Sequence, residues 1–224
     1  MKISDRRETC FISRIGVPTP LPYFLTTLED DQALALATLV PLLGCGEEAA
    51  ALAFDGLAEG ADTSVERYAL QGIAAEERVH DILLAQLAAS LPAINATAIR
   101  QKARRFHITL SRGDSGQHLA RIAAIDAAVC TILSRLLRAG TPISRDVAIR
   151  TMLARIRRDE ARHVAISRQI ARRSSNNVQD TGADARSALA DILVIGADAF
   201  ERLGVDPDQL FKDIRRLPEG LFAP

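Results

Sequence analysis

Glu76-Glu77-Arg78-Val79-His80 and Asp159-Glu160-Ala161-Arg162-His163 are the two stretches that decide the fold of this chain. Each contains a glutamate followed three residues later by a histidine, and a second acid directly before that glutamate. Residues three apart on an α-helix lie on the same side of adjacent turns, so the carboxylate and the imidazole can bind one metal ion. Two copies predict two helices that each bring a Glu-x-x-His pair into the interior.

Each motif follows an earlier acid at a spacing that suits a helix, a turn and half of a second helix. Glu47 lies thirty residues before Glu77, and Asp126 lies thirty-four residues before Glu160. Asp126 is the only acid in the middle of an apolar segment, and a buried carboxylate needs a cation or another partner. On the first helix we prefer Glu47, which shares its face with apolar residues, whereas Glu48 points about 100° away and is the alternative.

With these residues the chain resembles the ferritin-like di-iron carboxylate superfamily, in which two helices each give one carboxylate and two others each give Glu-x-x-His. The Asp-Glu-x-Arg-His form of residues 159–163 is similar to the motif of bacterial multicomponent monooxygenases. Phe54 matches an aromatic residue that recurs seven positions after the first glutamate. The resemblance covers roughly residues 30–172 and departs from the family at Asp126, where most relatives carry glutamate.

The resemblance implies a pair of iron ions, with manganese or a mixed iron and manganese pair as alternatives. The predicted metal ligands, which would also be the only catalytic residues, are Glu47, Glu77, His80, Asp126, Glu160 and His163. Glu76 and Asp159 are expected behind these ligands, where an acid would hydrogen-bond a ligand histidine. Mixed carboxylate and imidazole ligands suit iron or manganese and argue against a thiolate zinc site.

The predicted fold is all-α, a ferritin-like four-helix bundle with a long crossover between its second and third helices. The bundle occupies residues 29–173, with helices expected at residues 29–58, 64–90, 115–139 and 144–173. The first helix should bend or break near Pro41 and Gly44, and the crossover should contain one short helix at residues 96–106. Residues 1–28 are expected to be irregular. Residues 183–224 should add helices at 185–203 and 208–216 that pack on the bundle or form a dimer contact.

The composition argues against several other classes of protein and site. The 224 residues suit one domain, 48% are hydrophobic, and 28 basic residues balance 28 acidic ones, which gives no field for nucleic acid. The longest uncharged stretch, residues 33–46, contains Pro41 and is shorter than the ~20 residues of a membrane span. Cys10, Cys45 and Cys130 have no CxxC spacing, so we expect no disulfide framework and no rubredoxin-type iron centre. With no signal peptide visible, a reducing cytoplasm is expected.

Small and apolar residues beside the predicted ligands favour a pocket for an organic molecule. Its predicted lining is Ala50, Ala51, Phe54, Ile122, Val129 and Cys130. His118, by contrast, is expected to face solvent at the start of its helix. The predicted function is that of an oxidase or oxygenase that takes dioxygen, a small organic substrate and electrons from an external donor. The alternatives are iron oxidation and storage, as in ferritin or bacterioferritin, and a peroxide-consuming di-metal enzyme.

Overall fold

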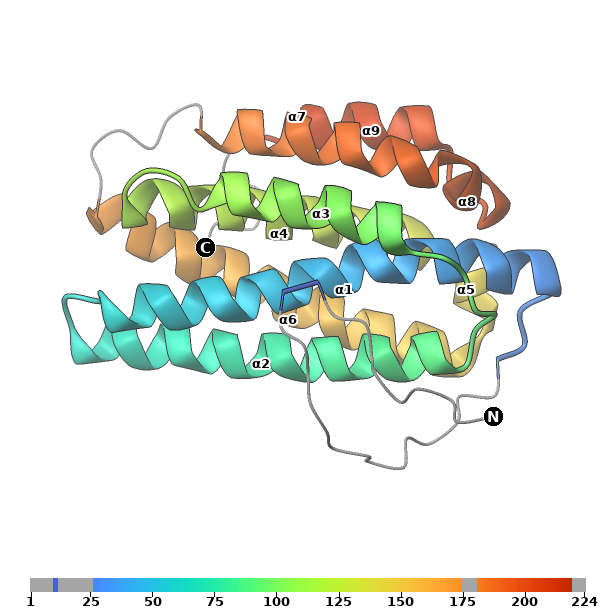
Figure 1. The fold of residues 1–224 in the computed structure, drawn as a ribbon, viewed down its shortest axis with the longest axis horizontal. Helices are drawn as coiled ribbons and strands as arrows, with labels where there is room; N and C mark the ends of the chain where they lie inside the picture. The colour runs from blue at the N-terminus through green and yellow to red at the C-terminus, as the bar shows by residue number, and fades with distance from the viewer. Residues whose placement is uncertain (1–9, 12–25, 175–180, 219–224) are drawn as a thin grey trace.

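Four long helices lie side by side in the computed structural model, which describes residues 10–11, 26–174 and 181–218. They are α1 (Asp30–Glu59), α2 (Ser64–Ala89), α4 (Ser115–Leu136) and α6 (Val147–Ser174). Helix α1 packs mainly against α2, α4 packs mainly against α6, and α2 also touches α6 (Figure 1). All the regular structure in the described residues is helical, so the predicted all-α class is confirmed.

Shorter helices connect and cover this set. They are α3 (Thr97–Leu110), α5 (Pro142–Arg145), α7 (Thr181–Leu193), the 3₁₀ turn η1 (Val194–Gly196), α8 (Ala197–Arg202) and α9 (Pro207–Arg215). Helix α3 joins α2 to α4 and packs against α1 and α7, while α7 lies along α4 and beside α9 (Figure 1). The chain therefore runs as one helix pair, a long crossover, a second pair and a C-terminal cover. Most of the segment predicted to be irregular, residues 1–28, lies outside the described residues.

Of the predictions about helix continuity, a break in the first helix and an unbroken helix over 185–203 were wrong. Helix α1 runs through Pro41 without a break, since proline removes only one backbone hydrogen bond and Leu39, Val40 and Leu42 are buried around it. The predicted helix 185–203 is instead divided by η1. At this turn a Cβ on Gly196 would lie 2.7 Å from Leu39 Cδ2, so the absence of a side chain lets the turn approach α1.

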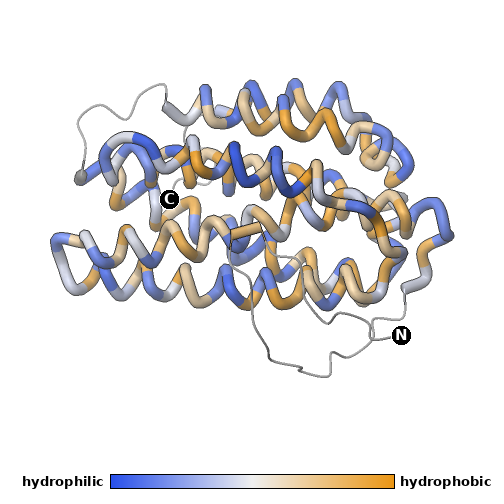
Figure 2. Tube along the Cα trace, in the orientation of Figure 1, coloured by the Kyte–Doolittle hydropathy of each residue, from blue (hydrophilic) through white to orange (hydrophobic). Residues whose placement is uncertain are grey.

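The four long helices bury most of their apolar residues in two cores, and a small third cluster contains Ile125 of α4. The larger core includes Leu36, Leu84, Leu136 and Leu153. The smaller core includes Phe54, Leu70, Leu119 and Ile170. Hydrophobic and hydrophilic segments alternate along the helices (Figure 2), as expected when one face of each helix is buried. On every long helix the predicted metal ligands lie between the residues of the larger core and those of the smaller core.

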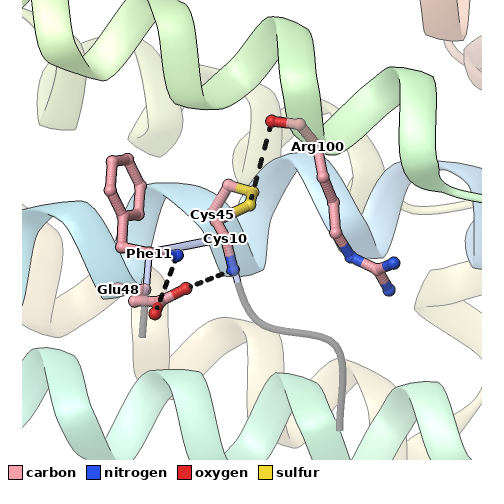
Figure 3. Close-up of a disulfide and its surroundings, with 5 residues drawn as sticks. All are labelled: Cys10, Phe11, Cys45, Glu48 and Arg100. Atoms are coloured by element: carbon pink, nitrogen blue, oxygen red, sulfur yellow. Dashed lines mark hydrogen bonds between the residues drawn. A yellow bond between two sulfur atoms is a disulfide. The ribbon is translucent and has the colours of Figure 1, made fainter. Parts of the chain in front are cut away.

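Cys10 and Cys45 form a disulfide with their Cα atoms 5.5 Å apart, a single crosslink that the expectation of no disulfide framework did not include. The pair is separated by 35 residues and follows no spacing motif, so only the folded chain brings it together. Next to it, the Glu48 carboxylate accepts hydrogen bonds from the backbone N–H groups of Cys10 (2.7 Å) and Phe11 (3.1 Å) (Figure 3). These contacts attach residues 10 and 11 to α1, while Cys130 is a buried free thiol.

Helix α1 is also long and apolar enough to cross a membrane by length and composition. Core helices of proteins without a membrane pass the same test, and half of the apolar window of α1 is buried within the protein. The helix also carries Glu47 and Glu48, both buried, at its middle. Its apolar character is explained by its packing in the two cores.

The buried side chain of Asp146 joins the segment before α1 to the start of α6. Its carboxylate accepts hydrogen bonds from the backbone N–H of Ile149 (3.0 Å) and from the backbone N–H of Thr27 (2.7 Å). The hydroxyl groups of Thr26 and Thr27 donate to the same carboxylate. Burial opposes ionisation, but these hydrogen bonds hold the pKa of Asp146 below its ordinary value of 3.8.

We expect Asp146→Ala to lower the free energy of unfolding at neutral pH by about 2 kcal/mol, because a helix cap and the partner of Thr27 are lost together. The pKa of Asp146 is lower in the folded state, so its contribution is complete above 3.8 and is lost as the pH falls through the folded value. Urea unfolding of both proteins across this range is the measurement. A difference that stays constant in acid would contradict the role given to the ionised carboxylate.

Candidate metal centre

Glu47, Glu77, His80 and Glu160 meet in the interior, between α1, α2 and α6. One ligand atom from each of the four lies within 4.8 Å of the others, and none of these residues is more than 5% exposed. His80 Nδ1 lies 3.2 Å from Glu47 Oε2, 3.5 Å from Glu77 Oε2 and 3.3 Å from Glu160 Oε1. Three carboxylates thus surround one imidazole nitrogen, and the group could hold a metal ion.

His163 lies beside this group on α6. Its Nδ1 atom is 2.9 Å from Glu77 Oε1 and 3.7 Å from Glu160 Oε2, and its ring centroid is 5.9 Å from that of His80. Glu77 and Glu160 therefore each direct one oxygen toward His80 and the other toward His163. This arrangement contains two adjacent positions, each next to one histidine and both glutamates.

Asp126 completes the set from α4 and is 5% exposed. Burial raises its pKa well above the ordinary value of 3.8, and the negative charges of Glu160 and Glu77 raise it further. The structure thus places all six predicted ligands in one buried layer, which we call the central cluster: Glu47, Glu77, His80, Asp126, Glu160 and His163. Glu47 belongs to it, whereas the alternative, Glu48, binds the N-terminal segment.

Three atoms of the central cluster fit a bound cation better than a hydrogen-bond network. Glu77 Oε1, Asp126 Oδ2 and His163 Nδ1 are buried and have no hydrogen-bond partner among the described residues. Glu77 Oε1 and His163 Nδ1 are close, but they are not aligned for a hydrogen bond. Buried polar atoms without partners cost free energy, and a cation would satisfy carboxylate oxygens and an imidazole nitrogen together.

Protons balance the charge of the central cluster when no metal is bound. Burial and the neighbouring Glu77 raise the pKa of Glu47 to about 8. Burial opposes a charge on His163, but Glu160 and Glu77 outweigh it and raise its pKa to about 11. The pKa of His80 is likewise raised by hydrogen bonds to Glu160, Glu47 and Glu77, against the effect of burial. A metal ion must therefore displace protons from these groups.

The predicted supporting acids contact the histidines in a crossed arrangement. Glu76 Oε2, on α2, lies 2.7 Å from Nε2 of His163 on α6. Asp159 Oδ2, on α6, lies 3.2 Å from Nε2 of His80 on α2. Since an ionised carboxylate only accepts hydrogen bonds, each Nε2 donates, and each Nδ1 faces the central cluster, where it would bind a metal ion once its proton is displaced.

Arg162 connects the two supporting acids. Its Nη2 atom donates to Glu76 Oε2 (2.6 Å) and to Asp159 Oδ1 (3.3 Å). Despite partial burial, the hydrogen bonds from Arg162 and the histidines hold the pKa of both acids below their usual range. The Arg162 side chain itself is 46% exposed. Its position three residues after Asp159 is the signal that could have identified this contact.

A cavity of about 530 Å³ lies beside the central cluster, between α1, α3, α4 and α7. Glu47, Glu77, Asp126 and Glu160 form part of its wall, and most of the remaining wall is apolar. Of the six predicted pocket residues, Ala50, Ile122 and Val129 line it. A cavity thus exists where an organic molecule could approach the carboxylates.

The other three predicted pocket residues, Ala51, Phe54 and Cys130, do not line this cavity. The Phe54 ring instead stands edge-on to His163, with centroids 6.4 Å apart, because its side of α1 faces the smaller core. The Cys130 thiol donates to the backbone carbonyl of Arg157 on α6. Burial and the charges of Glu160 and Asp126 raise the pKa of that thiol. These three predictions were wrong because a helical face does not reveal which neighbour it meets.

Two other histidines line the cavity. His118 was predicted to face solvent, but it is half-buried in the wall, and burial lowers its pKa to about 4. The nearby Arg121 lowers the pKa of His118 further. His107 on α3, which the sequence did not indicate, has its pKa lowered to about 4 by burial. Both imidazoles are therefore neutral at physiological pH.

Comparison with known proteins does not assign this site to a family. No protein-family model matches the chain, and no curated protein matches its sequence. The chemistry of the central cluster is therefore inferred from its ligand atoms and their surroundings.

We expect Glu76→Gln and Asp159→Asn each to weaken Mn²⁺ and Fe²⁺ binding roughly 10–100-fold, because each replaces the charged carboxylate that orients one histidine with a neutral amide. Competition with a chelator of known affinity measures this effect. Asp55→Asn is the matched control, since Asp55 pairs with Arg78 on the surface, away from both histidines. Equal affinities for all three variants would show that the two acids do not support metal binding.

We also expect metal binding to release protons and to strengthen as the pH is raised toward about 8, where Glu47 ionises in the metal-free protein. Metal affinity rises with pH because the pKa values of these groups are raised, and protons and metal compete for the same atoms. Titration calorimetry in buffers of different ionisation enthalpy counts the released protons. Binding without proton release would contradict a site within the central cluster.

Proposed function

We propose that the central cluster binds two iron ions and that the protein is an oxidase or oxygenase of the ferritin-like di-iron type. The observation that carries this proposal is the double orientation of Glu77 and Glu160, each with one oxygen toward His80 and one toward His163. A single ion would leave one of the two histidines without use. Glu47 on the His80 side and Asp126 from α4 supply the remaining carboxylates.

The order of the helices supports the ferritin-like part of the proposal. Helices α1 and α2 form one antiparallel pair, α4 and α6 form another, and α3 lies in the long connection between them. Each pair supplies one lone carboxylate followed by one Glu-x-x-His motif. Ferritin-like di-iron bundles combine this ligand set with one long crossover.

When bound, a pair of ferrous ions supplies the reductive activation of dioxygen. The protein's own residues hold and orient the site. Asp159 and Glu76 fix the two imidazole rings through Nε2, and Arg162 keeps both acids ionised at neutral pH. The mainly apolar wall of the cavity offers few hydrogen-bond partners to water on the side where an organic molecule would approach.

The cavity favours substrate oxidation over iron storage and over peroxide consumption. Neither alternative requires about 530 Å³ of mainly apolar space against the metal-binding carboxylates. This volume falls within the range of sites that hold small organic molecules. Electrons would come from an external donor, because the sequence has no CxxC pair for an internal iron–sulfur inlet.

The test loads the protein with Fe²⁺ without oxygen, measures bound iron, and then adds dioxygen, a chemical reductant and candidate substrates. We expect about two iron ions per chain and a product that has gained oxygen or lost hydrogen. Asp126→Asn should bind about one ion and oxidise substrate roughly 100-fold more slowly, whereas the exposed Asp198→Asn should match the wild type. Growth of a ferric core or rapid peroxide disproportionation, without an organic product, would instead identify one of the alternatives.

A further inference from the structure

The cavity beside the central cluster is elongated along two antiparallel helices. On α1 its wall extends from Leu42 to Leu57, fifteen residues apart, and on α4 from His118 to Ile132, fourteen residues apart. At the rise of an α-helix these intervals each span about 21–22 Å. A volume of about 530 Å³ distributed over that length suits one extended chain better than a compact ring system.

The two ends of the cavity differ in exposure and polarity. At one end, Leu42, Ile132 and Leu193 line the cavity, and each is less than a tenth exposed. At the other end, the lining includes Ser111 and Asp114 from the exposed connection between α3 and α4. The cavity is therefore closed at an apolar end and open at a polar one.

The charges along the wall select against anionic ligands. No lysine or arginine lines the cavity in the part of the chain that the structure describes. His107 and His118 are both neutral, because their pKa values are lowered to about 4. Glu47 and Asp126 would repel an anion and would be occupied by the metal ions. A buried carboxylate of a ligand would find no cation to pair with.

The central cluster reaches the cavity nearer to its closed end. Glu47 is five residues from Leu42 but ten residues from Leu57. Asp126 is six residues from Ile132 and eight residues from His118. A chain that fills the cavity would therefore pass the carboxylates at an interior carbon closer to its apolar end.

From these observations we propose, on the basis of the function proposed above, that the substrate is a linear aliphatic chain with a polar end that carries no negative charge. The chain enters apolar end first, its polar end stays beside Ser111, Asp114 and His118, and an interior C–H bond lies at the central cluster. In hydroxylation that C–H bond is replaced by C–O–H. One atom of dioxygen enters the chain, and the other leaves as water with two electrons from the external donor and two protons.

Binding to the metal-free protein tests the shape and charge of the ligand independently of the reaction. The probes are n-decanol, cyclodecanol and decanoate, which have the same number of carbon atoms, measured by titration calorimetry. We expect n-decanol to bind most tightly and the ring and the anion each to bind roughly tenfold more weakly. Equal binding of n-decanol and cyclodecanol would overturn the chain-shaped site, and tight decanoate binding would overturn its selection against charge.

Two variants test the direction of the chain. Ala53→Phe places a ring in the wall between the open end and the carboxylates and should abolish n-decanol binding, whereas Ala85→Phe, on α2 and outside the cavity, should not. If Ala53→Phe does not fold, as judged by circular dichroism, Ala50→Val provides the same test with a smaller side chain.

The second variant, Leu193→Ala, enlarges the closed end and should shift the preference toward longer n-alcohols. An unchanged chain-length preference in folded Leu193→Ala would overturn the proposed orientation.

The outcomes distinguish this inference from the proposed function. If n-decanol binds selectively but iron-loaded protein oxidises no chain, the ligand site stands and the oxygenase proposal fails. If iron-loaded protein oxidises only compact molecules, the oxygenase proposal stands and the linear substrate is wrong. In a protein that meets both expectations, mass spectrometry of the product should place the new oxygen at an interior carbon nearer the apolar end. Oxidation at the polar end would contradict the proposed orientation.

Discussion

Four carboxylates and two imidazoles buried in one layer are the constraint on which the rest of this structure depends. On each long helix the residues before and after the layer belong to different apolar cores, so packing on both sides holds these six side chains away from water. Such a layer is costly without compensation, because ionised groups lose their hydration and like charges repel. Protons on Glu47, His80 and His163 provide one compensation, and bound cations would provide a stronger one.

The sequence predicted those features of the site that depend on residues close together along one helix. The Glu-x-x-His spacing places Glu77 and His80 on one helical face wherever that helix lies, and a lone acid such as Asp126 in an apolar helix must point inward. The disulfide between Cys10 and Cys45 was missed because it depends on where a distant segment returns to α1. The same limit explains Arg162, whose partner Glu76 lies on another helix, 86 residues away.

The cavity shows a related limit of pattern reading. A helical wheel identified Phe54 and Ala50 as neighbours of Glu47, but it could not show that Phe54 meets His163 while Ala50 meets open space. That space is enclosed by α3 and α7, which contribute no ligand to the central cluster and pack against α1 and α4. Helices outside the ligand set therefore determine what can approach the ligands.

The central cluster has two different sides, and their separation has a chemical consequence. Behind the histidines, the partly exposed Glu76 and Arg162 reach solvent between α2 and α6. On the opposite side, Glu47 and Asp126 face the apolar cavity. Protons can therefore reach the imidazole rings through carboxylates without crossing the space where an organic molecule would bind. A buried charged layer that contacts water on one side and an apolar cavity on the other can exchange charge while it keeps a bound molecule dry.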